Sequence, residues 1–311
     1  MNEEAPTQFN EASQDSKETV GTARPVALVV ETAPAVEPAR RPRVWTVFAA
    51  YVSTIVLGTI VTMVHLVITL FGVAPGDWID ELAKRPLSFL WVMSYMLFAA
   101  LLVAFCAAFL SPVRWVCRLR LTAPSLSCMQ VATAAVGAVA IGLTFSMAYA
   151  LDFLPRSSTL EPLSAVIAGL LGLNLILGIV VIGILPAISE ELLFRGYLQT
   201  RLTQRWGARI SILLTALMFA AYHMDVSQGI LALGVGIYLG FVVERGNSIV
   251  PAIIGHAVNN TVALLLSVFL PDTLSRASLW VILLAAAVVL GLCLWHLRSA
   301  VPPDRTCMAG A

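Results

Sequence analysis

A few polar side chains lie within long apolar stretches of this sequence. Glu190 and Glu191 are adjacent, His223 follows further along the chain, and His256 precedes Asn260 by one helical turn. Ionisable residues in membrane segments are costly, so they usually face a bundle interior or a wet cavity. A carboxylate and two imidazoles are also groups that commonly activate water. These residues predict a hydrolase whose reaction takes place within the bilayer.

The composition is that of a membrane protein. Of the 311 residues, 59% are hydrophobic and only 12% are charged, and the mean hydropathy is +0.88. Soluble domains carry about 25% charged residues. A soluble protein of this length could not bury so much apolar surface, whereas helices that cross a bilayer require it. The net charge of +1 provides no basic field for phosphates, which excludes a nucleic-acid partner.

We predict an all-α fold, a polytopic membrane bundle of about eight transmembrane helices. A helix needs about 20 apolar residues to cross the hydrocarbon core. The candidate spans are 45–71, 87–110, 129–151, 163–188, 209–224, 229–243, 249–270 and 278–297. The fifth and sixth of these are short.

The same pattern divides the chain into four parts. Residues 1–43, rich in Pro, Ala, Thr and Glu, are predicted to form a disordered cytoplasmic tail. The N-terminal transmembrane helices occupy 44–160, the catalytic transmembrane core occupies 161–300, and 301–311 form a short C-terminal tail.

Arginine residues predict the orientation. Short cytoplasmic loops carry an excess of Lys and Arg. Arginines precede the first span and follow the second, fourth, sixth and eighth, while the other loops are mixed or acidic. Eight spans with both termini in the cytoplasm satisfy this rule at every loop.

The two adjacent glutamates have different helical environments. Glu191 and Arg195 are four residues apart and share a helix face, which suits an ion pair. Glu190 lies about 100° around the helix and is left free to act as a base. The alternative for this trio is an ordinary charged edge of a span.

The depth of His223 depends on a turn that we place at Gly207. Glu190 and His223 lie at similar distances on either side of this glycine, so an antiparallel hairpin brings them to the same level. A helix covering residues 163–206 would be about 66 Å long, twice the hydrocarbon thickness. We therefore expect either a projection beyond the bilayer or a break at Pro186.

His256 and Asn260 share a face of the seventh predicted span. The Asn side chain can hold a substrate carbonyl or orient water, because it has both a donor and an acceptor. The alternative is a polar pair that packs helices together, which is common in membranes.

Three motifs together resemble a known family. They are Glu190-Glu191-x-x-x-Arg195, Phe219-x-x-x-His223 and His256-x-x-x-Asn260. In this order and within predicted spans, they resemble the CPBP family of intramembrane proteases, which includes type II CAAX prenyl endopeptidases and bacterial self-immunity and sorting proteases. The resemblance covers about 165–267.

The resemblance implies a role for each matching residue. Glu190 would activate the hydrolytic water, and His223 and His256 would complete the site. Asn260 would hold the water or, with His256, stabilise the developing oxyanion. Glu191 and Arg195 would be the supporting ion pair, with Phe219 packed beside His223.

The cofactor and the substrate stay open at this stage. Glu190, His223 and His256 could hold zinc with one position left for water, and the same groups could polarise water without a metal. The implied partners are membrane lipid and a peptide or protein substrate, either lipidated or carrying a C-terminal sorting signal. The implied location is a bacterial inner membrane.

Two other functions compete with an intramembrane endopeptidase. A non-catalytic immunity or scaffold protein could keep the same fold and motif. A proton-coupled transporter could use the same buried acids and imidazoles to carry protons.

Overall fold

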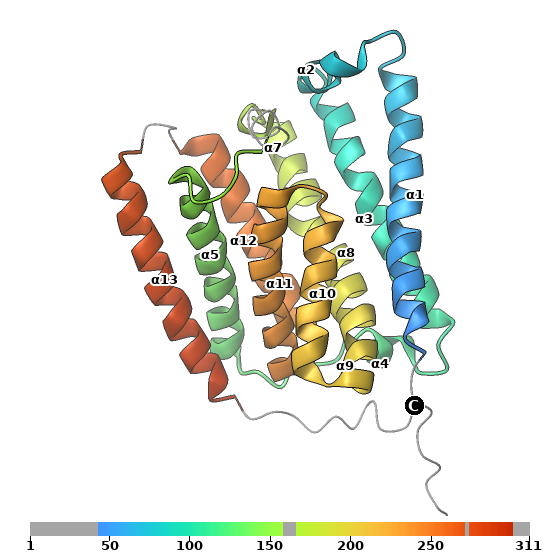
Figure 1. The fold of residues 1–311 in the computed structure, drawn as a ribbon, viewed down its shortest axis with the longest axis vertical. Helices are drawn as coiled ribbons and strands as arrows, with labels where there is room; N and C mark the ends of the chain where they lie inside the picture. Colours follow the sequence, from blue (N-terminus) through green and yellow to red (C-terminus); the bar gives the residue numbers. More distant parts are fainter. Residues whose placement is uncertain (1–42, 158–165, 271–273, 301–311) are drawn as a thin grey trace, which may run out of the picture. The chain divides into compact units, whose positions relative to one another are not determined.

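The computed structural model describes residues 43–157, 166–270 and 274–300, all of which belong to one compact unit. The predicted tails lie outside these ranges, apart from Arg43. The described elements are all helical (Figure 1), which confirms the all-α prediction. They are α1 (Trp45–Thr69), η1 (Pro75–Asp77), α2 (Trp78–Ala83), α3 (Pro86–Phe109), α4 (Trp115–Arg118), α5 (Cys128–Ala150), α7 (Leu173–Gly178), η2 (Ile179–Ile184), α8 (Leu185–Glu190), η3 (Glu191–Gln199), α9 (Thr200–Trp206), α10 (Ala208–Tyr222), α11 (Val226–Gly246), α12 (Val250–Phe269) and α13 (Arg276–Arg298).

Among the described residues, seven helices are long and apolar enough to cross a membrane. They correspond to α1, α3, α5, the continuous helix from α7 to α9, α11, α12 and α13. The predicted fifth span, 209–224, is the shorter apolar helix α10, which has only 15 residues. The polytopic bundle is therefore confirmed, with one of its eight predicted members too short to span alone.

The fourth predicted span was misplaced. It was expected over 163–188, but the helix begins at Leu173 and continues for 34 residues to Trp206. Gly172, just before it, has a φ of 55°, a left-handed conformation that glycine adopts without a steric penalty. Residues 158–165 lie outside the described ranges. The helix has a length of about 50 Å at 1.5 Å per residue, which exceeds the hydrocarbon thickness.

Pro186 does not break this helix. The π-helical stretch η2 lies immediately before it, and a second one, η3, begins at Glu191. The wider π-helical turn lets the N–H of Leu185 bond to the carbonyl of Val180. Proline has no N–H for the carbonyl four residues earlier, that of Ile182, and the side chain of Asn260 donates to this carbonyl at 3.4 Å. A contact from another helix thus replaces a bond within the helix.

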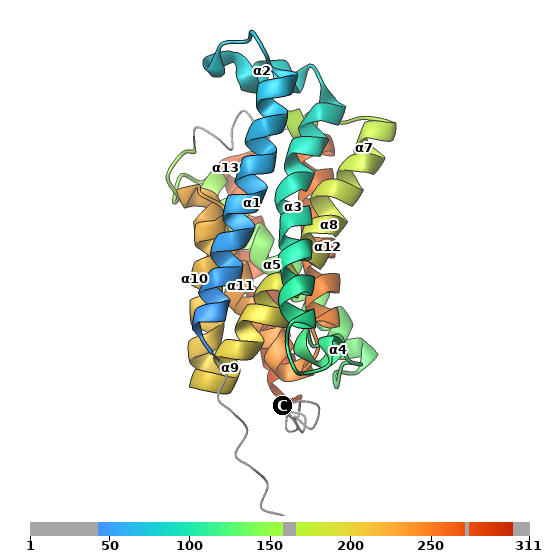
Figure 2. The ribbon, with the colours of Figure 1, turned by 90° about the vertical axis from the view of Figure 1, so that its right-hand side faces the viewer.

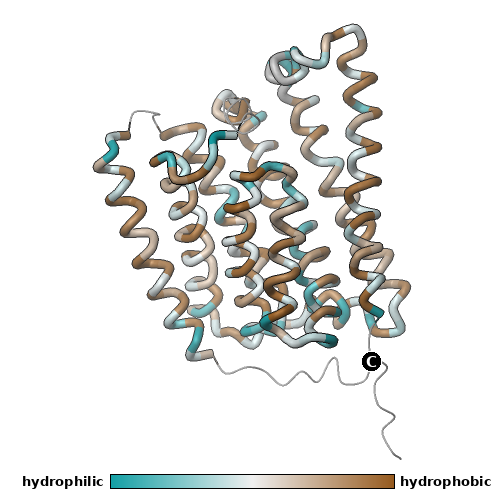
Figure 3. Tube along the Cα trace, in the orientation of Figure 1, coloured by the Kyte–Doolittle hydropathy of each residue, from teal (hydrophilic) through white to brown (hydrophobic). Residues whose placement is uncertain are grey.

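The bundle has two chemically different ends, which we name here. The arginine-rich end is where α1 begins, α9 and α13 end, and α4 lies; the α2 end is where α1 ends, α2 lies and α13 begins (Figure 1). Hydrophilic residues gather toward the helix ends and apolar residues along the helix lengths (Figure 3). The arginine-rich end carries Arg43, Arg114, Arg118, Arg120, Arg201, Arg205, Arg209, Arg245 and Arg298.

The α1–α3 hairpin packs onto the rest through α3, which contacts α8 and η3 (Figure 2). Two tyrosine hydroxyls add bonds between this hairpin and α10. Tyr51 on α1 donates to the carbonyl of Met218 at 3.0 Å, and Tyr222 on α10 donates to the carbonyl of Met96 at 3.3 Å. These bonds hold the hairpin beside the helices that carry the candidate residues.

The α10–α11 pair is closely packed because α11 presents glycine to α10. A Cβ added at Gly236 would lie 3.1 Å from the Cβ and 3.2 Å from the Cα of Ala216. Small residues at such a contact let two backbones approach, which is how membrane helices gain packing energy.

We expect Gly236→Val to lower the thermal unfolding temperature of the detergent-solubilised protein. Overpacking typically costs about 1–3 kcal/mol. The matched control is Gly291→Val, because a Cβ at Gly291 on α13 meets nothing within 4 Å. Equal melting temperatures for the two variants would show that this close approach does not contribute to stability.

Candidate active site

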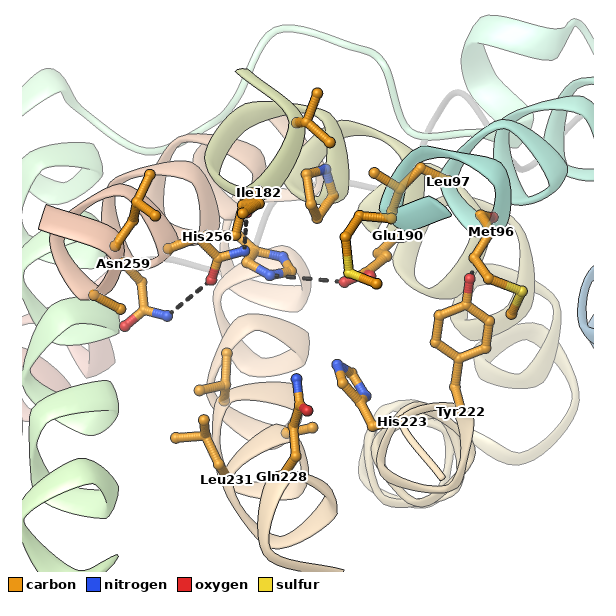
Figure 4. A pocket seen from close by; sticks show the side chains of 18 of the residues that line it. Met96, Leu97, Ile182, Glu190, Tyr222, His223, Gln228, Leu231, His256 and Asn259 are labelled. Atoms are coloured by element: carbon orange, nitrogen blue, oxygen red, sulfur yellow. Dashed lines mark hydrogen bonds and ion pairs between the residues drawn. The ribbon is translucent and has the colours of Figure 1, made fainter. Parts of the chain in front are cut away.

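A cavity of about 520 Å³ lies between the helices that carry the candidate residues. Figure 4 shows its side chains converging from several helices. Most of the lining is apolar, and the polar side chains include the predicted residues Glu190, His223, His256 and Asn260. The structure therefore brings all four together, from α8, the end of α10, and α12.

A chain of charged groups forms the base of this cavity. Arg195 Nη1 lies 2.9 Å from Glu191 Oε1, and both side chains are buried. His256 Nδ1 donates to the same Glu191 oxygen at 3.0 Å, while its Nε2 lies 3.7 Å from Glu190 Oε2. The predicted Glu191–Arg195 ion pair is present, and it fixes the orientation of the His256 ring. The ring then presents its other nitrogen to Glu190.

The position of His256 differs from the one that the oxyanion role would require. Its two ring nitrogens face the two glutamates, so neither is directed only toward the open cavity. Two carboxylates and one guanidinium leave one negative charge, which a single proton shared by Glu190 and His256 would neutralise. Neutrality matters because a net charge in an apolar interior is costly. The contacts therefore favour a proton-holding role for His256.

Phe219 contacts both the charged chain and the His223 ring. The Arg195 guanidinium lies over its ring at 4.5 Å from the centroid. The His223 ring meets it edge-on at 4.9 Å, and the His256 ring at 6.1 Å. This aromatic ring, which is 1% exposed, fixes the spacing of the two histidines. The sequence prediction that Phe219 packs beside His223 describes this arrangement.

His223 ends α10 and faces the cavity (Figure 4). Its Nδ1 lies 2.9 Å from the carbonyl oxygen of Phe219. Because a carbonyl oxygen can only accept, Nδ1 carries the proton and Nε2 is left for the cavity. The chain reverses directly after it: Met224 has a φ of 52°, and Asp225 caps α11 by accepting from the N–H of Gln228 at 2.9 Å.

The side chain of Asn260 is held at both of its polar atoms. Its Nδ2 donates to the carbonyl of Ile182, and its Oδ1 accepts from Asn259 Nδ2 at 3.1 Å. A primary amide has a second N–H, which can serve a ligand. Asn260 lines the cavity with this orientation already set.

The polar cavity residues that were missed from the sequence include Gln228 and Asn259. Gln228 extends from the first turn of α11 into the space that His223 also faces (Figure 4), and Asn259 orients Asn260. The adjacent pair Asn259-Asn260 in an apolar span was a usable signal for the second of these. Gln228 had no comparable signal, because it lies at the edge of a span where polar residues are ordinary.

The described residues do not gather as a metal site. Among them, no group of three or more His, Cys, Asp or Glu side chains is arranged to hold an ion. Both nitrogens of His256 face carboxylates, and the Nδ1 of His223 is bound to the carbonyl of Phe219. The donor set Glu190, His223 and His256 therefore does not fit a shared zinc ion in this arrangement.

A comparison with family models matches the part of the chain that carries these residues. Residues 172–262 match the family described as Type II CAAX prenyl endopeptidase Rce1-like. No curated protein and no solved structure matches the chain significantly. The matched segment runs from Gly172 past Asn260, so it contains every candidate residue named above.

We expect Arg195→Met to destabilise the protein strongly, by about 3–5 kcal/mol, because it leaves the buried Glu191 without its cation. Adding Glu191→Gln to this variant should recover part of the loss, since the carboxylate is then removed while an oxygen remains for His256. Unfolding in detergent checks both. Additive losses in the double variant would contradict a buried ion pair.

Proposed function

We propose that the protein is an endopeptidase that cleaves a membrane-associated peptide or protein, because residues 172–262 match the Rce1-like family of type II CAAX prenyl endopeptidases. The chain is an integral membrane protein, and its substrate is a peptide or protein. The hydrolytic water would be activated by Glu190. We further propose a bacterial cell membrane as its location.

The observation that carries this proposal is the contact of Glu190 with His256 in a mainly apolar cavity. A carboxylate beside an imidazole can exchange a proton without creating net charge. Here a second carboxylate, Glu191, orients that imidazole and is itself neutralised by Arg195. General acid–base catalysis needs a positioned side chain that can take up and return a proton, and Glu190 beside His256 meets this need.

The reaction would begin with water bound beside Glu190. With the shared proton on His256, the Glu190 carboxylate takes a proton from this water as its oxygen attacks the scissile carbonyl. The carbonyl oxygen becomes an oxyanion, and the second N–H of Asn260 is the donor that we assign to it. Glu190 then returns the proton to the leaving nitrogen, which breaks the carbon–nitrogen bond.

His223 and Gln228 face this reaction from the opposite wall of the cavity. His223 has its Nε2 available, because Nδ1 is bound to Phe219. We assign His223 to the scissile peptide, where it can donate when protonated. We assign Gln228 to the substrate backbone, because a primary amide both donates and accepts.

The apolar walls indicate how the substrate is held. They include methionine, leucine and valine side chains from α3 and α11. Such walls accept an apolar peptide or a lipid-modified one and leave orientation to the few polar groups. A lipidated peptide and a peptide with a C-terminal sorting signal both suit this lining.

We predict that Glu190→Gln reduces cleavage by at least a factor of about 100, since general-base catalysis contributes about 10²–10⁴. The substrate is identified first, by comparing protein termini in the membranes of cells that carry wild type or Glu190→Ala. The control is Glu81→Gln on α2, where Glu81 forms a surface pair with Lys84 at 2.6 Å. Lys84 holds the pKa of Glu81 below its usual value. Glu81→Gln therefore removes a charged carboxylate that lies away from the cavity.

Wild-type turnover by Glu190→Gln would contradict the proposed function. Full rescue of a cellular role by the same variant would instead support a non-catalytic immunity or scaffold protein on this fold. Loss of proton-dependent flux in sealed vesicles on His223→Ala would support a proton-coupled transporter.

We predict that a zinc chelator leaves cleavage by the purified protein unchanged, because the described donors do not gather around one ion. The measurement compares initial rates before and after chelation and dialysis. A loss of activity that returns on adding zinc would show that the donors rearrange to bind metal during catalysis.

A further inference from the structure

The cavity occupies only one half of the bundle. Thr62 of α1 and residues 92–97 of α3 line it, and both positions lie in the half of their helix nearer α2. The lining residues of α11, from Gln228 to Val235, likewise lie in its first half, next to the turn after α10. The cavity therefore extends from Glu190 and His256 toward the α2 end.

The opposite side of the site is closed by packed protein. Every residue from Glu191 to Thr200 is buried. Leu193, Phe194, Leu198 and Gln199 are each 0% exposed, and Arg195 is 1% exposed. These residues fill the helix between Glu190 and the arginine-rich end. Water and substrate consequently have no path to Glu190 along this helix from the arginine-rich end.

The path toward the α2 end can be followed along α12. His256 and Ser267 both line the cavity, and they are separated by about 16 Å at 1.5 Å per residue. Ser267 is exposed and lies near the end of its helix. The α10–α11 turn lies below the α2 end of α1 and α3 (Figure 1), so the upper part of these two helices extends beyond this short hairpin.

An unused polar group lies in this upper half. The hydroxyl of Thr62 is buried and has no hydrogen-bond partner among the described residues. Threonine in a helix ordinarily bonds a carbonyl of the preceding turn, as Thr54 does to Ala50 at 3.0 Å. A bound peptide strand could supply the missing partner, which suits a substrate that enters through this half.

The charge distribution identifies the two sides of the membrane. Nine arginines, named above, lie at the arginine-rich end, while charges of both signs are mixed at the α2 end. Acidic side chains there include Asp77, Glu81, Asp152 and Asp225. By the positive-inside rule, the arginine-rich end faces the cytoplasm. The cavity therefore extends toward the end of the bundle opposite to the arginine-rich end.

From these observations we propose that the catalytic cavity opens to the non-cytoplasmic side of the membrane. The substrate is then an exported peptide or the membrane segment of an exported protein, which enters from the outer half of the bilayer. This proposal rests on the proposed function for the reaction, whereas the direction of opening depends only on the cavity and the arginines.

Two serine-to-cysteine variants of the full chain test the direction. Ser267→Cys lies at the exposed end of the cavity, and Ser299→Cys lies exposed at the arginine-rich end. A membrane-impermeant maleimide is applied to spheroplasts and to inside-out vesicles, with the wild-type chain as background. We expect Ser267→Cys to be labelled in spheroplasts and Ser299→Cys only in inside-out vesicles.

Each other outcome overturns the proposal. The reversed pattern would place the opening in the cytoplasm. Labelling of Ser267→Cys from neither side would show that the cavity is closed to water, and labelling from both sides would show a passage through the bundle. Labelling does not require turnover, so it can be repeated in the Glu190→Gln variant. It therefore tests the direction of opening separately from the protease function.

Discussion

The buried ion pair between Glu191 and Arg195 is the interaction on which the rest of the site depends. A carboxylate 0% exposed is tolerable only with a cation and further donors beside it. Arg195 supplies the charge, and the Nδ1 of His256 supplies the second donor. Because Glu191 holds this ring, its other nitrogen faces Glu190. The surroundings of Glu190 therefore depend on a pair that is not among the cavity-lining residues.

The same pair also ties three helices together. Arg195 donates to the carbonyl of Gly236 on α11 at 3.4 Å, and its guanidinium lies over Phe219 on α10. The close approach of α10 and α11 at Gly236 makes room for this side chain. Packing and electrostatics thus reinforce each other, since the Phe219 ring beside Arg195 also contacts both histidine rings.

Much of the site followed from spacing in the sequence. The interval of four residues predicted the Glu191–Arg195 pair, and the turn at Gly207, whose φ is 80°, predicted that His223 and Glu190 reach one level. Both depend on local geometry within one helix or one hairpin. All-α organisation followed from hydropathy for the same reason, because long apolar runs in a bilayer must satisfy their own backbone bonds.

The remaining features depend on contacts between distant segments. Hydropathy does not break at Gly172, so the start of the fourth span was placed too early; the helix begins where a glycine takes a left-handed conformation. A projection beyond the bilayer or a break at Pro186 was expected, because the sequence does not show what replaces the hydrogen bond that proline cannot make. Asn260, 74 positions further along the chain, provides that substitute. The role of His256 between two carboxylates was likewise invisible without coordinates.

The most direct test of the account follows the oxygen of the attacking water. In a single turnover in ¹⁸O-labelled water, with enzyme in excess over substrate, activation of water by Glu190 places one ¹⁸O in the new carboxyl terminus of the product. Mass spectrometry of the product and of the peptide containing Glu190 reads the result. Product without ¹⁸O, accompanied by label in the Glu190 carboxyl group, would contradict the account, because Glu190 itself would then be the nucleophile.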